Sequence, residues 1–491
     1  MPDDARFSPE QFGAAFQSFL EWAREFPGAD DRSDVSVLIE DFLGPGASER
    51  SVVAKVLPPF EHVNLQAALD AWSDDSGREV IIHGISLPPH HGAVDLQQLI
   101  MAEGLRHVRL SPPAFADLPS GPSSTLACLQ YAVLLVSDGR GRYVLLVRAP
   151  GEHDPRLVVE IAGLAVEDAQ GVHAELERLR HELNVYRGQV LDVGVSEMGN
   201  VTLSFAAAPQ IARAAVVLPV AVMDRVERHA VGVSSHRQAL LAAGQHLKRG
   251  LLLYGPPGTG KTHTTRYLVG QMAGYTRLTL TGRALRVIGE VADLARELEP
   301  SMIVLEDVDL VAEHRTAGPA ASPVLFDLLD AMDGAAPDAD LLFVLTTNRA
   351  DLLEPALAAR PGRVDVAIEI ALPEPDARDK LLLLYAGSLP LHLSDAEREQ
   401  IVTRTEGVTA SFLKELLRRA TLEALSDDPA LTTVTAEHVG RALDDLLDGG
   451  QQLTRSLLGV GNDPESLPPG GGAGALPPQS GRARAMMRRM S

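Results

Sequence analysis

Cysteine is nearly absent from this chain of 491 residues, and long apolar runs are missing. Because Cys128 is the only cysteine, no intrachain disulfide and no cluster of cysteine ligands can form, and we expect its side chain to be a small core hydrophobe. No uncharged apolar stretch reaches the ~18 residues that a membrane span needs. The N-terminus also lacks the basic start and apolar run of a signal peptide. These absences predict a cytoplasmic protein without a membrane span.

Positive charge is also scarce. The chain has 44 Lys and Arg residues against 66 Asp and Glu residues, a formal net charge of −22. Residues 1–120 alone hold 19 acidic and 8 basic residues. Proteins that bind nucleic acid draw much of their affinity from Lys and Arg on phosphates, so we expect no nucleic-acid partner.

The first 214 residues carry no recognisable catalytic pattern. The segment Leu118–Ser124, LPSGPSS, is typical of a linker and predicts an acidic α/β domain at 1–122. Strand-like runs joined by Asp138–Gly141 then predict a hairpin within a small α+β domain at 123–214. At the other end, residues 450–491 are rich in glycine and proline with a basic terminus, and we expect a disordered tail.

The chemically informative region starts at a buried-strand run, Gly250–Tyr254, that leads into the pattern GxxxxGKT. Glycines in such a loop let backbone N–H groups surround phosphates, the lysine meets the β- and γ-phosphates, and the threonine hydroxyl ligates Mg²⁺. A helix that begins at Lys261 adds the positive end of its dipole. The expected nucleotide-binding residues are Gly255, Pro256, Pro257, Gly258, Thr259, Gly260, Lys261, Thr262 and His263.

Two further strands end in polar residues that suit nucleotide hydrolysis. The apolar run before Glu306, Asp307 and Asp309 predicts a strand with acids at its end, where one carboxylate serves Mg²⁺ and one polarises water. A later run, Leu341–Leu345, leads to Asn348, a neutral donor able to orient water against a γ-phosphate. Together with the GxxxxGKT loop, these strand ends predict an ATP site.

In this order the motifs resemble those of the AAA (AAA+) family of ring-forming ATPases. The matching segments are Gly255–Thr262 (GPPGTGKT), Leu305–Asp309 (Walker B), Leu328–Gly334 (LLDAMDG), Thr346–Arg349 (sensor 1, TTNR) and Arg360–Asp365 (arginine finger, RPGRVD). The resemblance implies an α/β fold: a P-loop large subdomain with a parallel sheet at 215–372 and a helical lid at 373–449, preceded by the α+β N-terminal domains.

The resemblance also implies ligands and site residues. ATP and Mg²⁺ would bind between the subunits of a homo-oligomer, a hexameric ring in this family, with Thr262 and Glu306 at the metal. The expected catalytic residues are Lys261, Glu306, Asp307, Asn348 and, from the neighbouring subunit, Arg363. Val231 and Gly232 would line the adenine pocket.

The chain departs from the family pattern at three places. The family usually places Asp before Glu in Walker B, whereas Glu306 here precedes Asp307, a swap that resembles the mitochondrial Rieske-protein translocase subgroup, whose membrane helix this chain lacks. The pore-loop segment, Val287–Glu290, has no aromatic residue, and Val366 stands where a second finger arginine often occurs. No HExxH motif is present, so a fused FtsH-type zinc protease is not expected.

The leading hypothesis is an ATP-hydrolysing ring that remodels, unfolds or translocates a protein client, with residues 1–214 selecting that client. An alternative is a nucleotide-gated assembly scaffold with slow hydrolysis, which the swapped acids and the pore-loop segment favour. A DNA-loading ATPase is disfavoured by the net charge of −22.

Overall fold

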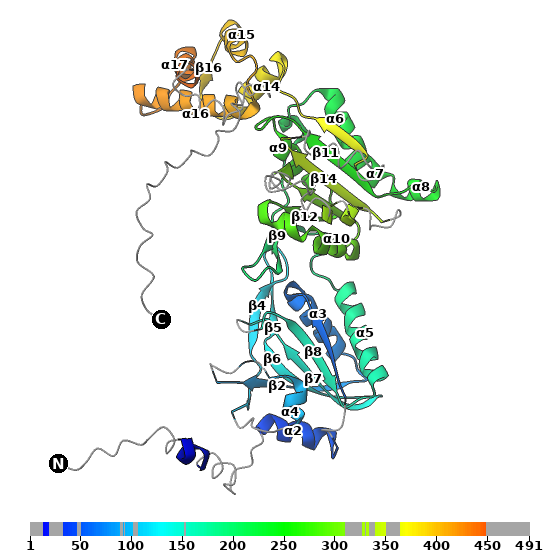
Figure 1. The fold of residues 1–491 in the computed structure, drawn as a ribbon. Coiled ribbons are helices and arrows are strands. Elements are labelled where there is room, and N and C mark those ends of the chain that lie inside the picture. Colours follow the sequence, from blue (N-terminus) through cyan, green and yellow to red (C-terminus); the bar gives the residue numbers. More distant parts are fainter. Residues whose placement is uncertain are drawn as a thin grey trace, which may run out of the picture.

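The computed structural model describes residues 13–18, 33–46, 51–88, 92, 94–101, 107–151, 154–309, 327–328, 330–332, 339–349 and 364–447. Most of them form three bodies: an N-terminal α/β body, a central body around a parallel sheet, and a C-terminal group of helices (Figure 1). No helix among the described residues is both long enough and apolar enough to cross a membrane.

The N-terminal body is built on a six-stranded antiparallel sheet in the order β1-β8-β7-β6-β2-β3. Side chains alternate between the faces of a strand, so Leu145 and Val147 of β7 pack with helices α3 and α5, whereas Val144 and Leu146 pack with α2 and α4. The elements are β1 (Val52–Leu57), β2 (Glu79–Ser86), β3 (Arg109–Ser111), β6 (Tyr131–Asp138), β7 (Gly141–Arg148), β8 (Leu157–Ala162), α2 (Asp34–Leu43), α3 (His62–Ser73), α4 (Leu96–Met101) and α5 (Val166–Glu182).

The predicted domain boundary at residue 122 is wrong. Strands β1 to β3 come before it and β6 to β8 after it, yet all six share one sheet. The linker-like segment Leu118–Ser124 instead turns the chain between β4 (Phe115–Pro119) and β5 (Thr125–Leu129), which pair as a hairpin. Glycine, proline and serine favour tight turns as well as linkers, so composition alone could not separate the two.

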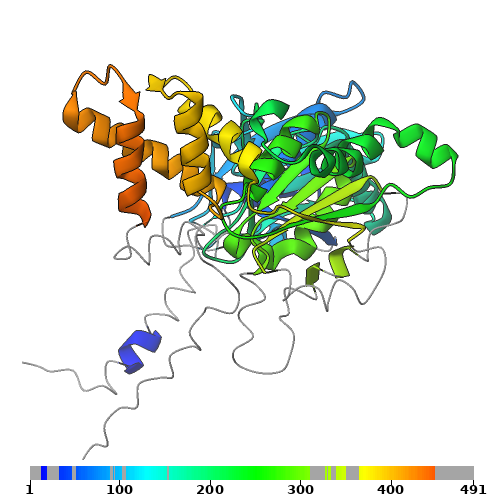
Figure 2. The same cartoon turned by 90° about the horizontal axis from the view of Figure 1, so that it is seen from above.

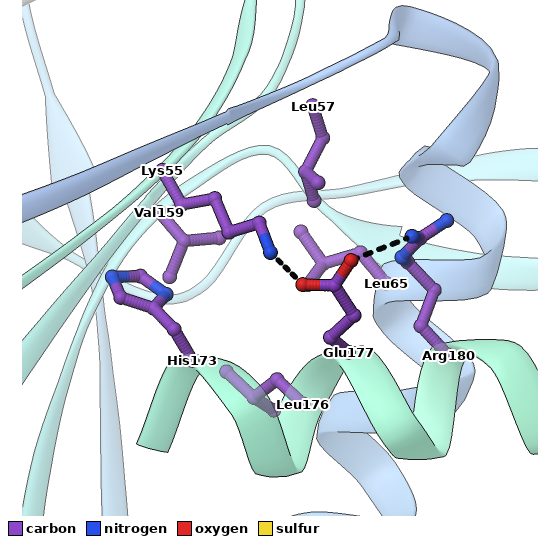
Figure 3. Close-up of a pocket in the computed structure, with 8 residues that line it drawn as sticks. All are labelled: Lys55, Leu57, Leu65, Val159, His173, Leu176, Glu177 and Arg180. Carbon is purple, nitrogen blue, oxygen red and sulfur yellow. Dashed lines mark ion pairs between the residues drawn. The ribbon is translucent and has the colours of Figure 1, made fainter. Parts of the chain in front are cut away.

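A buried ion pair joins α5 to the start of α3 in this body. Arg180 Nη1 lies 2.7 Å from Glu61 Oε2, and both side chains are almost fully buried. Figure 3 shows Arg180 and Lys55 pointing toward Glu177 from either side, and both form ion pairs with it. The charges around Arg180 are therefore compensated within the body.

The central body contains a seven-stranded sheet in the order β10-β9-β12-β13-β14-β11-β15. Every pair is parallel except β9 with β10. One face packs against α9 and α6 and the other against η5 and α10. The elements are β9 (Val190–Val195), β10 (Val201–Phe205), β11 (Arg249–Tyr254), β12 (Thr276–Leu280), β13 (Ser301–Leu305), β14 (Leu341–Thr347), β15 (Val366–Glu369), α6 (Val220–Glu227), α9 (Lys261–Gln271), η5 (Gly282–Val287) and α10 (Ile288–Glu297). The predicted α/β fold with a parallel sheet is confirmed.

Strands β9 and β10 correct the domain prediction a second time. They lie within the segment predicted as a separate α+β domain at 123–214, yet they extend the central sheet beyond β12. The junction between the two bodies is packed: the Tyr186 ring lies 5.6 Å from Phe205 and 6.4 Å from Phe60, and its hydroxyl donates to Phe60 O at 2.7 Å. Cys128 is buried in the same apolar cluster, as predicted.

The C-terminal helices form a separate apolar cluster beside the central sheet (Figure 2). They are α14 (Pro375–Ala386), α15 (Asp395–Arg404), α16 (Ala410–Asp427) and α17 (Ala436–Leu447), with a short parallel pair formed by β16 (Leu391–His392) and β17 (Val434–Thr435). Ser394 and Thr409 cap α15 and α16 with their hydroxyl oxygens. The predicted tail at 450–491 lies outside the described residues.

Candidate nucleotide site

The loop between β11 and α9 needs glycine at particular positions. Gly255, Gly258 and Gly260 have φ of 146°, 78° and 107°, in the region that favours glycine. A Cβ on Gly255 would also lie 2.3 Å from Ile370 O, and one on Gly258 would lie 3.0 Å from Ser411 Oγ at the first turn of α16. The loop thus packs against the residue that follows β15 on one side and against α16 on the other.

Lys261, at the start of α9, is held inside this loop. Its side chain is buried, and Nζ donates to Gly255 O and Pro256 O at 2.8 Å each. Burial lowers the pKa of Lys261 to about 8, while the negative charges of Asp307 and Asp309 oppose the shift. A buried ammonium at a helix N-terminus, held by a glycine-shaped loop, suits an anionic phosphate chain.

Glu306 lies on the α9 side of the site, directly after β13. Its Oε1 accepts a hydrogen bond from Thr265 Oγ1 at 3.2 Å, and Thr265 stands one turn after Thr262 on α9. Burial raises the pKa of Glu306, the Asp307 charge raises it further, and the Thr265 hydroxyl lowers it. A bound cation would offset that unfavourable burial of negative charge.

The donor set around Glu306 fits Mg²⁺. Among the described residues, no group of three or more His, Cys, Asp or Glu side chains could hold a metal ion. Mg²⁺ usually takes one or two protein oxygens and completes its shell with water and substrate phosphates. The Thr262 hydroxyl and the Glu306 carboxylate are oxygen ligands of that kind, so they are the residues that would hold the ion.

Asp307 lies beside the end of β14. Asn348 Nδ2 is 3.4 Å from Asp307 Oδ1, and the Asp307 N–H donates to Thr346 Oγ1 at 3.0 Å. Asp307 has φ of 52°, a left-handed conformation that Asp tolerates better than most residues. The structure therefore brings together an acid and an amide that the sequence placed 41 residues apart.

Sequence reasoning missed the role of three residues near this pair. Asp309 is buried and accepts hydrogen bonds from Thr347 Oγ1 and from the Asn348 N–H. Thr346 binds the loop that carries Asp307. The available signal was the position of Asp309 in the same acidic segment as Glu306, but sequence spacing does not show which acids bond to a neighbouring strand.

The remaining predicted site residues lie apart from the acids or outside the described part. Val231 and Gly232 belong to the π-helical turn η4 (Arg228–Gly232) and are half-buried beside α9. His263 is exposed, with Nε2 3.1 Å from Ala215 O. Arg363 lies outside the described residues.

The predicted pore-loop segment has a different local structure from a loop. Val287 ends η5 and Ile288 begins α10. Ile288 is fully buried in the core, and Val287 packs against the same cluster, whereas Gly289 and Glu290 are exposed. Both aliphatic side chains of this segment thus stabilise the central body.

Comparisons with known proteins agree with this geometry. Residues 251–372 match the family model described as "ATPase family associated with various cellular activities (AAA)". The chain is 33% identical over 230 residues to an ATP-dependent zinc metalloprotease FtsH of Alkalihalophilus pseudofirmus, covering 44% of this chain and 33% of the relative. It is 36% identical over 195 residues to a 26S proteasome regulatory subunit 6B homolog of Encephalitozoon cuniculi, covering 36% and 49% respectively.

A third relative is a proteasome-activating nucleotidase of Thermococcus gammatolerans. It is 31% identical over 235 residues, which cover 45% of this chain and 58% of the relative. The chain thus spans between a third and about three fifths of these relatives' lengths. The similarity covers the nucleotide site and not the whole of any of these proteins.

Proposed function

We propose, from the premise that residues 251–372 are an ATPase domain of the AAA family, that this chain binds and hydrolyses ATP to remodel a protein client. One observation carries the proposal. The carboxyl ends of three neighbouring parallel strands, β11, β13 and β14, bring Lys261, Glu306, Asp307 and Asn348 to one edge of the sheet. Ligands of open α/β sheets bind at this edge.

Each side chain has a distinct role in this proposal. The loop N–H groups and the Lys261 ammonium hold the β- and γ-phosphates, so that the reacting phosphate lies at the N-terminus of α9. Asp307 takes the proton of the attacking water, and the Asn348 amide orients that water or the γ-phosphate. Mg²⁺, held through Thr262 and Glu306, would neutralise charge that develops on the phosphate oxygens.

The contacts of the two acids support different roles for them. Glu306 bonds to α9, which carries the metal-binding hydroxyl, and Asp307 contacts Asn348. The family's usual order of these acids is reversed in the chain, so the water-polarising side chain is one methylene shorter. We therefore propose slow hydrolysis relative to proteins with Glu at this position.

The assembly is part of the proposal. We propose a homo-oligomeric ring of six subunits in the cytoplasm, with Arg363 reaching the γ-phosphate of the neighbour and Val231 and Gly232 lining the adenine pocket. The packed junction at Tyr186 supports coupling between the N-terminal body and the ATPase, which would let residues up to 182 engage a protein client. No nucleic-acid partner is proposed.

A second candidate is the nucleotide-gated scaffold, in which ATP drives assembly and hydrolysis resets it. The burial of Ile288 favours it, because an aliphatic side chain in the core cannot grip a polypeptide. ATP turnover and mass photometry over a range of protein concentrations separate the two. Turnover per subunit that rises with assembly supports the remodelling ATPase. The remodelling ATPase should also unfold a folded model protein that carries an unfolded tag when ATP is present. ATP-driven assembly with negligible turnover would favour the scaffold and contradict the proposed ATPase.

A further inference from the structure

Side chains at the end of β14 fix the loop that follows β13. Asp309 Oδ1 accepts from Thr347 Oγ1 at 3.0 Å and from the Asn348 N–H at 3.1 Å. Val308 N donates to Thr346 O at 3.0 Å, and Thr346 Oγ1 accepts from the Asp307 N–H. Since the Asp309 side chain is buried, the bonds from Thr347 and from the Asn348 N–H hold its carboxylate in a place of low dielectric constant.

The carboxylate of Asp309 also faces the Asn348 side chain. Asn348 Nδ2 lies 3.5 Å from Asp309 Oδ2 and 3.4 Å from Asp307 Oδ1. An ionised carboxylate can only accept hydrogen bonds, whereas an amide donates from nitrogen and accepts at oxygen. Two carboxylates on one side of the amide therefore select the orientation with Nδ2 toward them and turn Oδ1 away.

The position of Asp309 links it to the phosphate end of the site. Thr347 and Asn348, to which Asp309 bonds, stand at the end of β14. Asn348 in turn lies beside the Asp307 carboxylate, so the geometry connects Asp309 to the groups that are proposed to act on the γ-phosphate.

We infer that Asp309 is a positioning residue of the ATPase site: its buried carboxylate holds the main chain of Asn348 and sets which end of the Asn348 amide faces Asp307. This inference rests on the proposed ATP hydrolysis. Asp309 does not touch the phosphates itself. It keeps the Asn348 amide in a fixed position and orientation relative to the Asp307 carboxylate, which reduces the reorganisation needed when water attacks.

The direct test is steady-state ATP turnover by the full chain carrying Asp309→Asn. The new amide keeps an oxygen that accepts from Thr347 and from the Asn348 N–H, so the fold is retained. Its nitrogen, however, opposes Asn348 Nδ2, donor against donor, and favours a turned Asn348 amide. We expect kcat to fall on the order of tenfold or more with KM for ATP changed by less than about threefold, the pattern of a lost transition-state arrangement.

A conservative pair at Thr347 gives a second route to the same answer. Thr347→Ser keeps the hydroxyl that donates to Asp309, so its kcat should stay near the wild-type value. Thr347→Val removes that hydroxyl and should lower kcat. Asp74→Asn, at an exposed acid after α3, is the matched control and should leave turnover unchanged. Melting temperatures and ATP-analogue affinities are measured for every variant.

The outcomes separate this inference from the proposed function. Wild-type turnover together with full turnover in Asp309→Asn overturns the inference alone. A loss of melting temperature and of nucleotide affinity in Asp309→Asn, in place of a loss of kcat, also overturns it, because the residue would then be structural. A wild-type chain that binds ATP without any turnover overturns the proposed ATPase first and the inference with it.

Discussion

The buried ammonium of Lys261 makes nucleotide affinity depend on pH in a defined direction. The pKa of Lys261 is lowered to about 8, and a polyphosphate favours the charged form. Raising the pH through this value therefore deprotonates the free protein and weakens binding. The lowered pKa also affects stability, because burying the charged lysine costs free energy on folding. The free energy of unfolding should therefore rise as the pH increases from 8 toward the ordinary lysine pKa.

The magnitude follows from the pKa. At pH 7 about one Lys261 in eleven is neutral, and at pH 9 about ten in eleven are. If only the charged form binds, the dissociation constant should rise about tenfold from pH 7 to pH 9, a loss of about 1.4 kcal/mol in binding free energy. At pH 8, binding should take up about half a proton per nucleotide.

Isothermal titration calorimetry with a non-hydrolysable ATP analogue measures both quantities. Titrations at several pH values give the dissociation constants, and buffers of different ionisation enthalpy give the proton uptake. Lys261→Arg should flatten the profile, because a guanidinium stays charged throughout. The exposed Lys380→Arg should keep the wild-type profile. A wild-type dissociation constant that is flat from pH 7 to pH 9, with no proton uptake, would refute the reasoning.

Two further predictions concern stability and the shape of the loop. Arg180→Met leaves the Glu61 carboxylate buried without its partner, so unfolding free energy should fall by about 3–5 kcal/mol, while Arg178→Met, from an exposed pair, should cost less than about 1 kcal/mol. Equal losses in denaturant titrations would show that burial does not matter. Gly258→Ala adds a Cβ at φ of 78° against α16 and should weaken ATP-analogue binding, whereas Gly199→Ala, at φ of 86° in open space, should only lower stability by about 1–2 kcal/mol. Unchanged nucleotide affinity in Gly258→Ala would contradict the predicted contact.

The sequence alone predicted those parts of the site that come directly after a strand. GPPGTGKT before α9 and the acids after β13 have strong local patterns, and parallel strands necessarily bring their carboxyl ends to one edge. Continuous apolar runs likewise predicted β11, β13 and β14 of the central sheet. These features depend on residues close together in the chain.

Features that depend on long-range pairing could not be predicted in this way. The sheet that joins β1 to β8 pairs Val52 with Ala162, and no local pattern indicates that partner. The Asp309 bonds also require the relative placement of β13 and β14. The burial of Ile288 could not be predicted either, because a short aliphatic segment has the same composition in a loop and in the first turn of a buried helix.

The central claim is that Asp307 polarises the attacking water while Glu306 serves Mg²⁺. Its most direct test is single-turnover ATP hydrolysis by Asp307→Asn, with binding of a non-hydrolysable ATP analogue measured in parallel. The account predicts analogue affinity close to wild type and no detectable hydrolysis, because an amide cannot take the proton of water. Hydrolysis at the wild-type rate in Asp307→Asn would contradict it.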